Sequence, residues 1–316
     1  NVTVDISEVD DAPVIDGDAI SVDMSEGGSP IAFNLTLNAS DVEGNAISWD
    51  ISAVASQGSA SVTSGIGEQQ TINYVPNTNF NGTDNFTVRA TANAKVDTIP
   101  VTVNVQGVND NPLITQGANA TVNMSEDSDP TPFVLALSAT DVDGDDLTWS
   151  ITGQGSLGTA SVDSLAGLTK NISYTPNPDA NGTDNFVVTV TDGIGVPANI
   201  DITVEISEVD DAPVISEGDA VSVDMSEDGS PDSFSLTLNA SDPEGDAISW
   251  NISTVASHGT ANVTSGNGLQ QAINYTPVAN FNGTDTFTVR VAANGKVDSI
   301  PVTVNVIAVN DNPLIT

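Results

Sequence analysis

The sequence predicts an all-β protein built of tandem seven-stranded Greek-key β-sandwiches that follow one another as a linear rod. Three observations predict it. The sequence repeats itself with a period of about 100 residues, the size of one β-sandwich domain. Within each repeat, short runs alternate apolar and polar residues, and Gly, Asn, Asp and Pro separate these runs. No segment has the periodicity of an amphipathic helix.

The repeat is clearest in one motif. "VDDAPVI" at 9–15 returns as "VNDNPLI" at 108–114, and both forms recur at 209–215 and 309–315. The first and third copies are the most alike, since 81–105 almost repeats at 282–306, so we name them type A and the middle copy type B. The expected organisation is the last strand and linker of a preceding repeat (1–10), repeat 1 of type A (11–110), repeat 2 of type B (111–211), repeat 3 of type A (212–311) and the start of a following repeat (312–316).

Period-two alternation places seven strands in repeat 1. Their apolar positions fall within 20–24, 33–37, 47–51, 59–62, 72–74, 86–88 and 101–105. Alternating strands bury one face each, and two sheets packed on those faces close a core. Trp49, Trp149 and Trp250 lie in the same predicted strand of successive repeats, so we expect them in the core rather than on a sugar-binding surface.

Composition limits the possible partners. The chain has 316 residues, no cysteine, and 5 Lys and Arg against 43 Asp and Glu, for a formal charge of -38. Such a field repels nucleic acid and anionic membranes and favours cations. Disulfides and thiolate-bound zinc are excluded. No apolar run reaches the roughly 20 residues that a membrane-spanning helix needs, so we expect a soluble segment whose export signal, if any, lies elsewhere.

Acidic turns recur between the second and third predicted strands. They read "DVEGNA" from Asp41, "DVDGDD" from Asp141 and "DPEGDA" from Asp242. On an extended turn, the two acids of an Asp-x-Asp/Glu pair point the same way, about 7 Å apart. Oxygens on one side of a chain suit Ca²⁺, which takes six to eight of them. The alternative is that these acids are ordinary solvated turn residues.

A pair of acids is too few for calcium, so other ligands have to come from elsewhere. The linkers that precede each proline offer Asn109 and Asp110 at one junction and Asp210 and Asp211 at the next. Acids also recur after "MS" and in "NGTD", at Glu26, Glu126 and Glu227 and at Asp84, Asp184 and Asp285. Acids on both sides of every junction favour calcium over turn chemistry alone.

These motifs resemble the cadherin-like repeats of large bacterial surface adhesins and, more remotely, the cadherins. "VNDNP" is similar to the linker between cadherin repeats, and "LSATDVDGDDLTWSI" to the cadherin stretch in which an Asp-x-Asp turn precedes a strand. The resemblance covers essentially the whole chain. It implies an immunoglobulin-like or cadherin-like sandwich and Ca²⁺ between successive repeats.

Carried over residue by residue, the resemblance implies a ligand set at each junction. Between repeats 1 and 2 it comprises Glu26, Asn109, Asp110, Asp141 and Asp143; between repeats 2 and 3 it comprises Glu126, Glu208, Asp210, Asp211, Asp242 and Glu244. The outer junctions contribute Glu8, Asp10, Asp11, Asp41, Glu43, Glu227, Asn310 and Asp311.

Two departures from the cadherin pattern matter. The Asp-Arg-Glu triplet late in the cadherin module is absent, and "NFNGTD" stands near its place, which makes Asp84, Asp184 and Asp285 the weakest candidate ligands. Glu8 and Glu208, which stand two residues before the first Asp or Asn of the linker, become Gly107 and Ala308 in the other linkers. We therefore expect fewer or weaker calcium ions at junctions that lead from type A to type B.

Nothing in the sequence favours an enzyme. "GQGSLG" at 153–158 has no strand-to-helix context, and the single histidine, His258, is replaced by Gln57 and Leu157 in the other repeats. The expected function is a calcium-rigidified spacer of a large extracellular adhesin, whose partners are the neighbouring repeats of the same chain. The alternatives are homotypic assembly into fibres or a matrix, and binding of surface polysaccharide or another cell by the repeats.

Overall fold

Each repeat folds into two four-stranded sheets that pack face to face. The computed structural model describes residues 2–310. In repeat 1 one sheet has the order β1-β3-β6-β5 and the other β2-β8-β7-β4. The strands are β1 (Val14–Ile15), β2 (Ile20–Ser25), β3 (Leu35–Ser40), β4 (Ser48–Ala53), β5 (Gly58–Val62), β6 (Gln69–Pro76), β7 (Gly82–Ala92) and β8 (Lys95–Gln106).

The start of each repeat crosses from one sheet to the other. β1 pairs antiparallel with β3, and after Gly17 the chain changes sheets so that β2 pairs parallel with β8. The positive φ of Gly17, 100°, is accessible to glycine at little cost. The seven predicted strands are confirmed; β1, only two residues long, is too short for an alternating pattern to reveal.

Repeats 2 and 3 repeat this topology. In repeat 2 the strands are β9 (Leu113–Ile114), β10 (Asn119–Ser125), β11 (Leu135–Thr140), β12 (Thr148–Gly153), β13 (Gly158–Val162), β14 (Thr169–Pro176), β15 (Gly182–Thr191) and β16 (Ala198–Ser207). In repeat 3 they are β17 (Val214–Ile215), β18 (Val221–Ser226), β19 (Leu236–Ser241), β20 (Ser249–Thr254), β21 (Gly259–Val263), β22 (Gln270–Pro277), β23 (Gly283–Ala293) and β24 (Lys296–Ile307).

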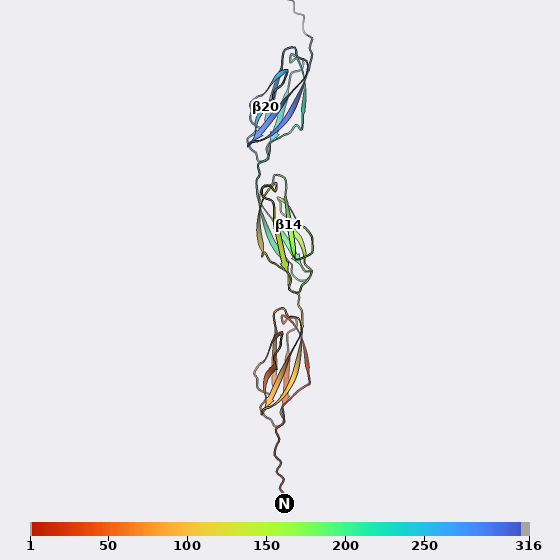
Figure 1. The fold of residues 1–316 in the computed structure, drawn as a ribbon, viewed down its shortest axis with the longest axis vertical. Helices are drawn as coiled ribbons and strands as arrows, with labels where there is room; N and C mark the ends of the chain where they lie inside the picture. The colour runs from red at the N-terminus through yellow and green to blue at the C-terminus, as the bar shows by residue number, and fades with distance from the viewer. Residues whose placement is uncertain (1, 311–316) are drawn as a thin grey trace, which may run out of the picture.

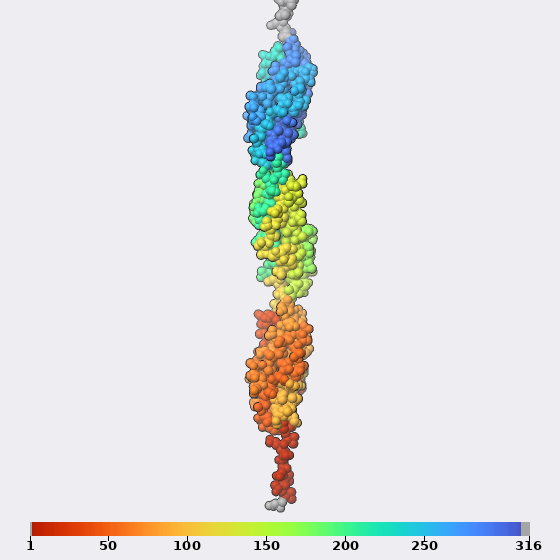
Figure 2. All heavy atoms as spheres, turned by 60° about the vertical axis from the view of Figure 1, so that its left-hand side comes forward, coloured from red at the N-terminus to blue at the C-terminus, as the bar shows by residue number. Residues whose placement is uncertain are grey.

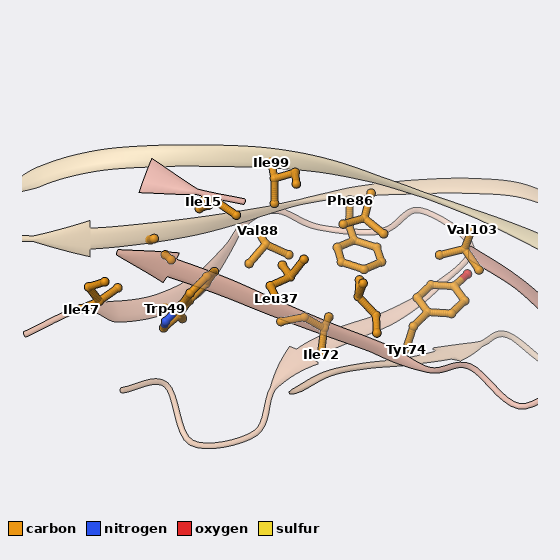
Figure 3. Packing of buried hydrophobic residues seen from close by; sticks show 14 of the residues in the cluster. Ile15, Leu37, Ile47, Trp49, Ile72, Tyr74, Phe86, Val88, Ile99 and Val103 are labelled. Carbon is orange, nitrogen blue, oxygen red and sulfur yellow. The ribbon is translucent and has the colours of Figure 1, made fainter. Parts of the chain in front are cut away.

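One apolar core fills the space between the two sheets of each repeat. In repeat 1, Leu37 and Ile72 from one sheet meet Phe86 and Val88 from the other, and Trp49 closes one end (Figure 3). The indole N–H of Trp49 donates to the carbonyl of Gly67 at 2.6 Å, which satisfies its one polar atom. Equivalent residues form separate cores in repeats 2 and 3, so the predicted core position of the tryptophans is confirmed.

The three sandwiches lie end to end as a slender rod (Figures 1 and 2). A short linker joins successive repeats. Across it, the end of one sandwich faces the start of the next. Residues 2–13 lie in no strand, although 1–6 resembles the closing strand of repeat 2. Among residues 2–310, no helix is long and apolar enough to cross a membrane.

A core truncation should destabilise one repeat and spare the others. Leu37→Ala removes a side chain that is 2% exposed, and we expect it to lower the free energy of unfolding of repeat 1 by about 2–5 kcal/mol. Val75→Ala, on the neighbouring strand but 66% exposed, is the matched control and should change it by less than about 0.5 kcal/mol. Hydrogen exchange followed by mass spectrometry during denaturant unfolding reads the repeats separately. Equal losses in all three repeats would contradict independent cores.

Candidate junction cation sites

The first linker is held by carboxylates from both repeats that it joins. The backbone N–H of Val108 donates to Glu26 Oε1 of repeat 1 at 2.7 Å. The N–H of Asp110 donates to Asp143 Oδ2 of repeat 2, also at 2.7 Å. Val108 and Asp110 are separated by only two positions in the sequence. Their hydrogen bonds therefore hold carboxylates of the two domains close to one another.

The linker between repeats 2 and 3 uses the same pair of bonds, and each outer linker shows one of them. Between repeats 2 and 3, Val209 N–H donates to Glu126 Oε1 at 2.7 Å and Asp211 N–H to Glu244 Oε2 at 3.0 Å. At the outer ends, half of the arrangement lies within the described residues. Asp11 N–H donates to Glu43 at 3.2 Å, and Val309 N–H donates to Glu227 at 2.8 Å.

Three groups of carboxylates result. In each group, one oxygen from every member lies within 4.8 Å of the others. The groups are Glu26, Asp110 and Asp143; Asp141, Asp143 and Asp145; and Glu126, Asp211 and Glu244. The first two share Asp143 at the first junction, and the third lies at the second junction. Surface hollows lie beside both junctions, one lined by Glu26 and Asp110 and the other by Glu126 and Asp211.

The first acid of each acidic turn folds the turn with one oxygen and leaves the other without a donor. Asp141 Oδ1 accepts N–H bonds from Asp143, Gly144 and Asp145 at 3.0–3.3 Å. This tight turn brings Asp141 and Asp143 closer than the 7 Å expected for an extended turn, and that expectation was wrong. Among the described residues, four buried carboxylate oxygens have no hydrogen-bond partner: Asp41 Oδ2, Asp141 Oδ2, Asp242 Oδ2 and Glu126 Oε2.

Crowding of like charges opposes ionisation at these junctions. Partial burial, followed by the charges of Asp141, Asp143 and Asp192, raises the pKa of Asp145. Burial and the charges of Asp127 and Glu244 likewise raise the pKa of Asp211. In repeat 3, burial, a hydrogen bond with Asp210 and the charge of Asp242 raise the pKa of Asp246. A cation placed among these carboxylates would offset their mutual repulsion and stabilise their ionised forms.

Comparison with known proteins identifies the repeats. A family model described as the bacterial Ig domain matches residues 10–106, 109–205 and 210–306. The chain belongs to this family. Each match covers one sandwich, so the chain is a tandem array of three bacterial Ig repeats.

Solved cadherin structures share the architecture of these Ig repeats. Three repeats of mouse cadherin-23, EC22-24, match with a TM-score of 0.54 and 18% identity over 95% of this chain and 100% of that one. Domains 1-5 of protocadherin gamma B2 match with a TM-score of 0.53 and 20% identity over 95% of this chain and 60% of that one. At these identities the likeness shows the fold alone, three tandem sandwiches of the cadherin type.

A curated relative is similar to part of the array. Protein dachsous of Drosophila melanogaster is 28% identical over 151 residues, which is 45% of this chain and 4% of that protein. The Ig array therefore spans a very small part of the length of this relative, and the similarity extends over about half of the array.

The structure brings most of the sequence-predicted ligands together at the two inner junctions. At the first, Glu26, Asp110, Asp141 and Asp143 lie in the clusters, whereas Asn109 bonds to Asp192. At the second, Glu126, Asp211 and Glu244 form the cluster. Asp242 supplies an unpartnered oxygen, Asp210 accepts from Asn294, and Glu208 is exposed outside the cluster.

The outer junctions are represented in part. Asp41, Glu43, Asp10 and Asp11 keep the positions of their inner counterparts, and Glu8 lines a hollow with Asp10 and Glu43. Glu227 bonds the linker, and Asn310 is the last described residue. Asp311 lies outside the described residues. That any of these residues binds a metal stays a prediction.

The acids of "NGTD" have a different environment. Asp84, Asp184 and Asp285 are each only 2–3% exposed within a single Ig repeat and belong to no carboxylate cluster of the described residues. Asp84 accepts N–H bonds from Ser56, Gln57 and Asn85 and the hydroxyl of Tyr74 at 2.8–3.0 Å. Its oxygens are already occupied by donors, so the structure places these three residues in the framework of the sandwich.

Sequence reasoning missed Asp145 and Asp192. Asp145 is the fifth residue of the acidic turn and completes a cluster, and Asp192 stands in the loop between β15 and β16 and faces the linker. The first was visible as an extra acid in "DVDGDD". The second lies 83 residues from its linker partner, Asn109, and only the pairing of β15 with β16 brings it there.

The buried aspartate should stabilise its repeat in a pH-dependent way. Burial tends to raise the pKa of Asp184, but hydrogen bonds from Tyr174 and the N–H groups of Ser156 and Leu157 outweigh it and lower the pKa below its ordinary value. Asp184→Asn leaves donors unmatched, so we expect a loss of about 1–3 kcal/mol in the free energy of unfolding of repeat 2 at pH 7. Denaturant unfolding across pH measures it.

The depressed folded-state pKa sets the direction of the pH effect. The stabilisation is fully present above the unfolded pKa, about 3.9, and is lost as the pH falls through the lower folded-state value. The deficit of Asp184→Asn should therefore shrink in acid. Asp201→Asn, an exposed change on β16, is the control. A deficit that stays constant down to about pH 2 would show that ionised Asp184 does not carry the stabilisation.

Proposed function

We propose that this chain is a spacer segment of a large extracellular surface protein, in which Ca²⁺ at each junction locks successive Ig repeats into a rigid rod. The established part is a tandem array of cadherin-like bacterial Ig repeats, a domain type typical of extracellular and surface proteins. Carboxylate clusters at the junctions are compatible with calcium. The identity of the ion, the spacer role and the surface location are the proposal.

The observation that carries the proposal is the second oxygen of Glu126. This side chain is 6% exposed, Oε1 accepts the linker N–H of Val209, and Oε2 accepts nothing among the described residues. A buried, ionised oxygen without a partner costs several kcal/mol unless a cation or donor approaches it. Asp211 and Glu244 place further oxygens within 4.8 Å, and a hard cation is the ligand that such an all-oxygen set prefers.

Calcium fits the donor set better than the other common metals. The clusters offer carboxylates, and no cysteine exists in the chain, which disfavours zinc and copper. Several carboxylates from separate backbone segments suit the flexible coordination of Ca²⁺ better than the strict octahedron of Mg²⁺. Residues that would hold the ion at the second junction are Glu126, Asp211, Asp242 and Glu244.

Cation binding at these positions would control the shape of the array. Glu126 belongs to the upstream repeat, Asp211 to the linker and Glu244 to the downstream repeat. An ion bound by all three would connect the two repeats through the linker. Without it, like charges repel one another across the junction, and nothing fixes the angle between the repeats, so the linker can flex.

A spacer role agrees with the surface of the rod. The large aromatic residues lie in the cores, and the three repeats have nearly equal outlines, without a protruding domain (Figure 2). We therefore propose a non-catalytic role whose immediate partners are the neighbouring repeats. Homotypic contacts and polysaccharide binding would require a specialised surface.

Calcium should stabilise and straighten the chain. Extracellular calcium modules bind at about 10⁻⁴ to 10⁻³ M, and a hundredfold excess of ion adds about 2.7 kcal/mol per site. For a domain of about 100 residues this raises the melting temperature by roughly 10–20 °C. Small-angle scattering in about 10 mM calcium should give a longer and narrower distance distribution than scattering in chelator.

One variant localises the effect. Glu126→Gln keeps an oxygen for Val209 N–H and removes a charged ligand, so it should reduce the calcium-induced rise in the melting of repeats 2 and 3. Asp219→Asn removes the same charge from an exposed site outside the clusters and should leave the rise intact. Equal melting and equal length with calcium and with chelator would rule out the metal.

A further inference from the structure

Each linker touches the loop between the last two strands of the repeat that follows it, through one amide and one carboxylate. In repeat 1, Asn93 Nδ2 of the loop donates to Asp10 Oδ1 of the linker at 3.0 Å. In repeat 3, Asn294 Nδ2 donates to Asp210 Oδ1 at 2.8 Å. In repeat 2 the partners are exchanged, and Asn109 Nδ2 of the linker donates to Asp192 Oδ2 of the loop at 2.9 Å.

The loop of type A repeats explains why the amide stands there. β7 and β8 are joined by a two-residue hairpin, Asn93 and Ala94, with φ of 43° and 67°. Asn294 in repeat 3 has φ of 44°. Such a turn requires positive φ at both positions, which asparagine tolerates well. With an amide in the loop, the linker has to supply the acceptor, and it supplies Asp10 and Asp210.

The loop of the type B repeat carries a carboxylate where the type A loop carries an amide. It runs over six residues, 192–197, between β15 and β16. Asp192 Oδ1 accepts the N–H of Ile194 at 2.8 Å and so folds the start of the loop. Its other oxygen, Oδ2, accepts from Asn109 at 2.9 Å. With the carboxylate in the loop, the linker has to supply the donor.

A second contact distinguishes the two linker types. In repeat 2 the N–H of Val196 donates to Asn111 Oδ1 at 2.8 Å. The loop approaches Asn111 so closely that a Cβ at Gly195 would lie 2.6 Å from this oxygen, and Gly195 has φ of +74°. Type A linkers carry Ala12 or Ala212 at this position. In repeat 3, Lys296, which begins β24, instead donates to the carbonyl of Asp210.

We propose that each linker is a recognition element specific for the loop of the repeat that follows: Asp-Asp-Ala-Pro for the two-residue loop of type A and Asn-Asp-Asn-Pro for the six-residue loop of type B. A mismatched Asp-Asp-Ala-Pro linker would set an aspartate against Asp192 in a type B repeat. A mismatched Asn-Asp-Asn-Pro linker would set two amides together in a type A repeat, with no charge to strengthen the bond. The linker and its following repeat therefore form one unit, and this matching uses hydrogen bonds between protein groups.

An exchange of the two partners tests the proposal in the whole chain. Asn109→Asp, Asp192→Asn and the double variant are compared in chelator, where no divalent cation can bridge them. The readout is hydrogen exchange of the linker amides around Asp110. Asn109→Asp should accelerate it about tenfold, the loss that corresponds to one charge-assisted hydrogen bond. Asp192→Asn leaves a neutral pair of amides and should accelerate it less.

The double variant should restore the contact with its direction reversed. The amide introduced at position 192 can donate to the carboxylate introduced at position 109, and its own oxygen can still accept from Ile194. Exchange of the linker amides should therefore return to within about twofold of the original rate.

A third variant separates matching from general loosening. Asn111→Ala removes the acceptor for Val196 N–H and should accelerate exchange in both the original and the double-variant background, because that bond does not involve the exchanged pair. Exchange of β15 and β16 should not change in any variant, which verifies that repeat 2 is folded. Unchanged exchange in Asn109→Asp, or failure of the double variant to recover, would overturn the proposal.

Discussion

The arrangement of the rod depends on hydrogen bonds that each inner linker donates to carboxylates of both repeats that it joins. Val108 and Asp110 present backbone N–H groups that a short linker cannot bond within itself, and Glu26 and Asp143 accept them. These bonds satisfy the backbone, but they bring anionic side chains of two domains and the linker within 4.8 Å of one another. The same contacts that position the repeats thus concentrate the negative charge, and this concentration makes the junction receptive to a cation.

Buried aspartates elsewhere in the repeat show what distinguishes a framework acid from a candidate ligand. Asp84 is as buried as any junction acid, yet the hydroxyl of Tyr74 and three backbone N–H groups occupy both of its oxygens. Asp141 uses one oxygen for its own turn, and the other has no partner among the described residues. Burial alone does not identify a metal ligand. An unsatisfied oxygen among like charges is the feature that makes a carboxylate a candidate ligand, because a cation bound there would offset both costs.

Local patterns predicted most of the fold, and contacts between residues far apart in the sequence account for what the patterns did not show. Alternation identified seven strands per repeat, and the recurring junction acids identified the clusters. β1 was not predicted, because two residues are too few to show an alternating pattern. Asp84, Asp184 and Asp285 recur as regularly as the junction acids, and nothing in "NGTD" reveals that a tyrosine ten residues earlier donates to them. Asp192 was not predicted either, because its partner, Asn109, lies far away in the sequence, in the linker that precedes the repeat.

The difference between type A and type B repeats is concentrated where repeats meet. Val88, Val188 and Val289 occupy the same fully buried position, and the three sandwiches share one topology, so the cores place no demand on the order of the repeats. At the junction, the hairpin of type A carries an asparagine, whereas the loop of type B carries an aspartate. Each choice determines the residue that the preceding linker can carry. All three contacts pair one carboxylate with one amide, so the charge of the contact stays the same. What changes is whether the amide donor belongs to the loop or to the linker. A chain that alternates loops must therefore alternate linkers in the same register, and the two linker forms of the sequence do so.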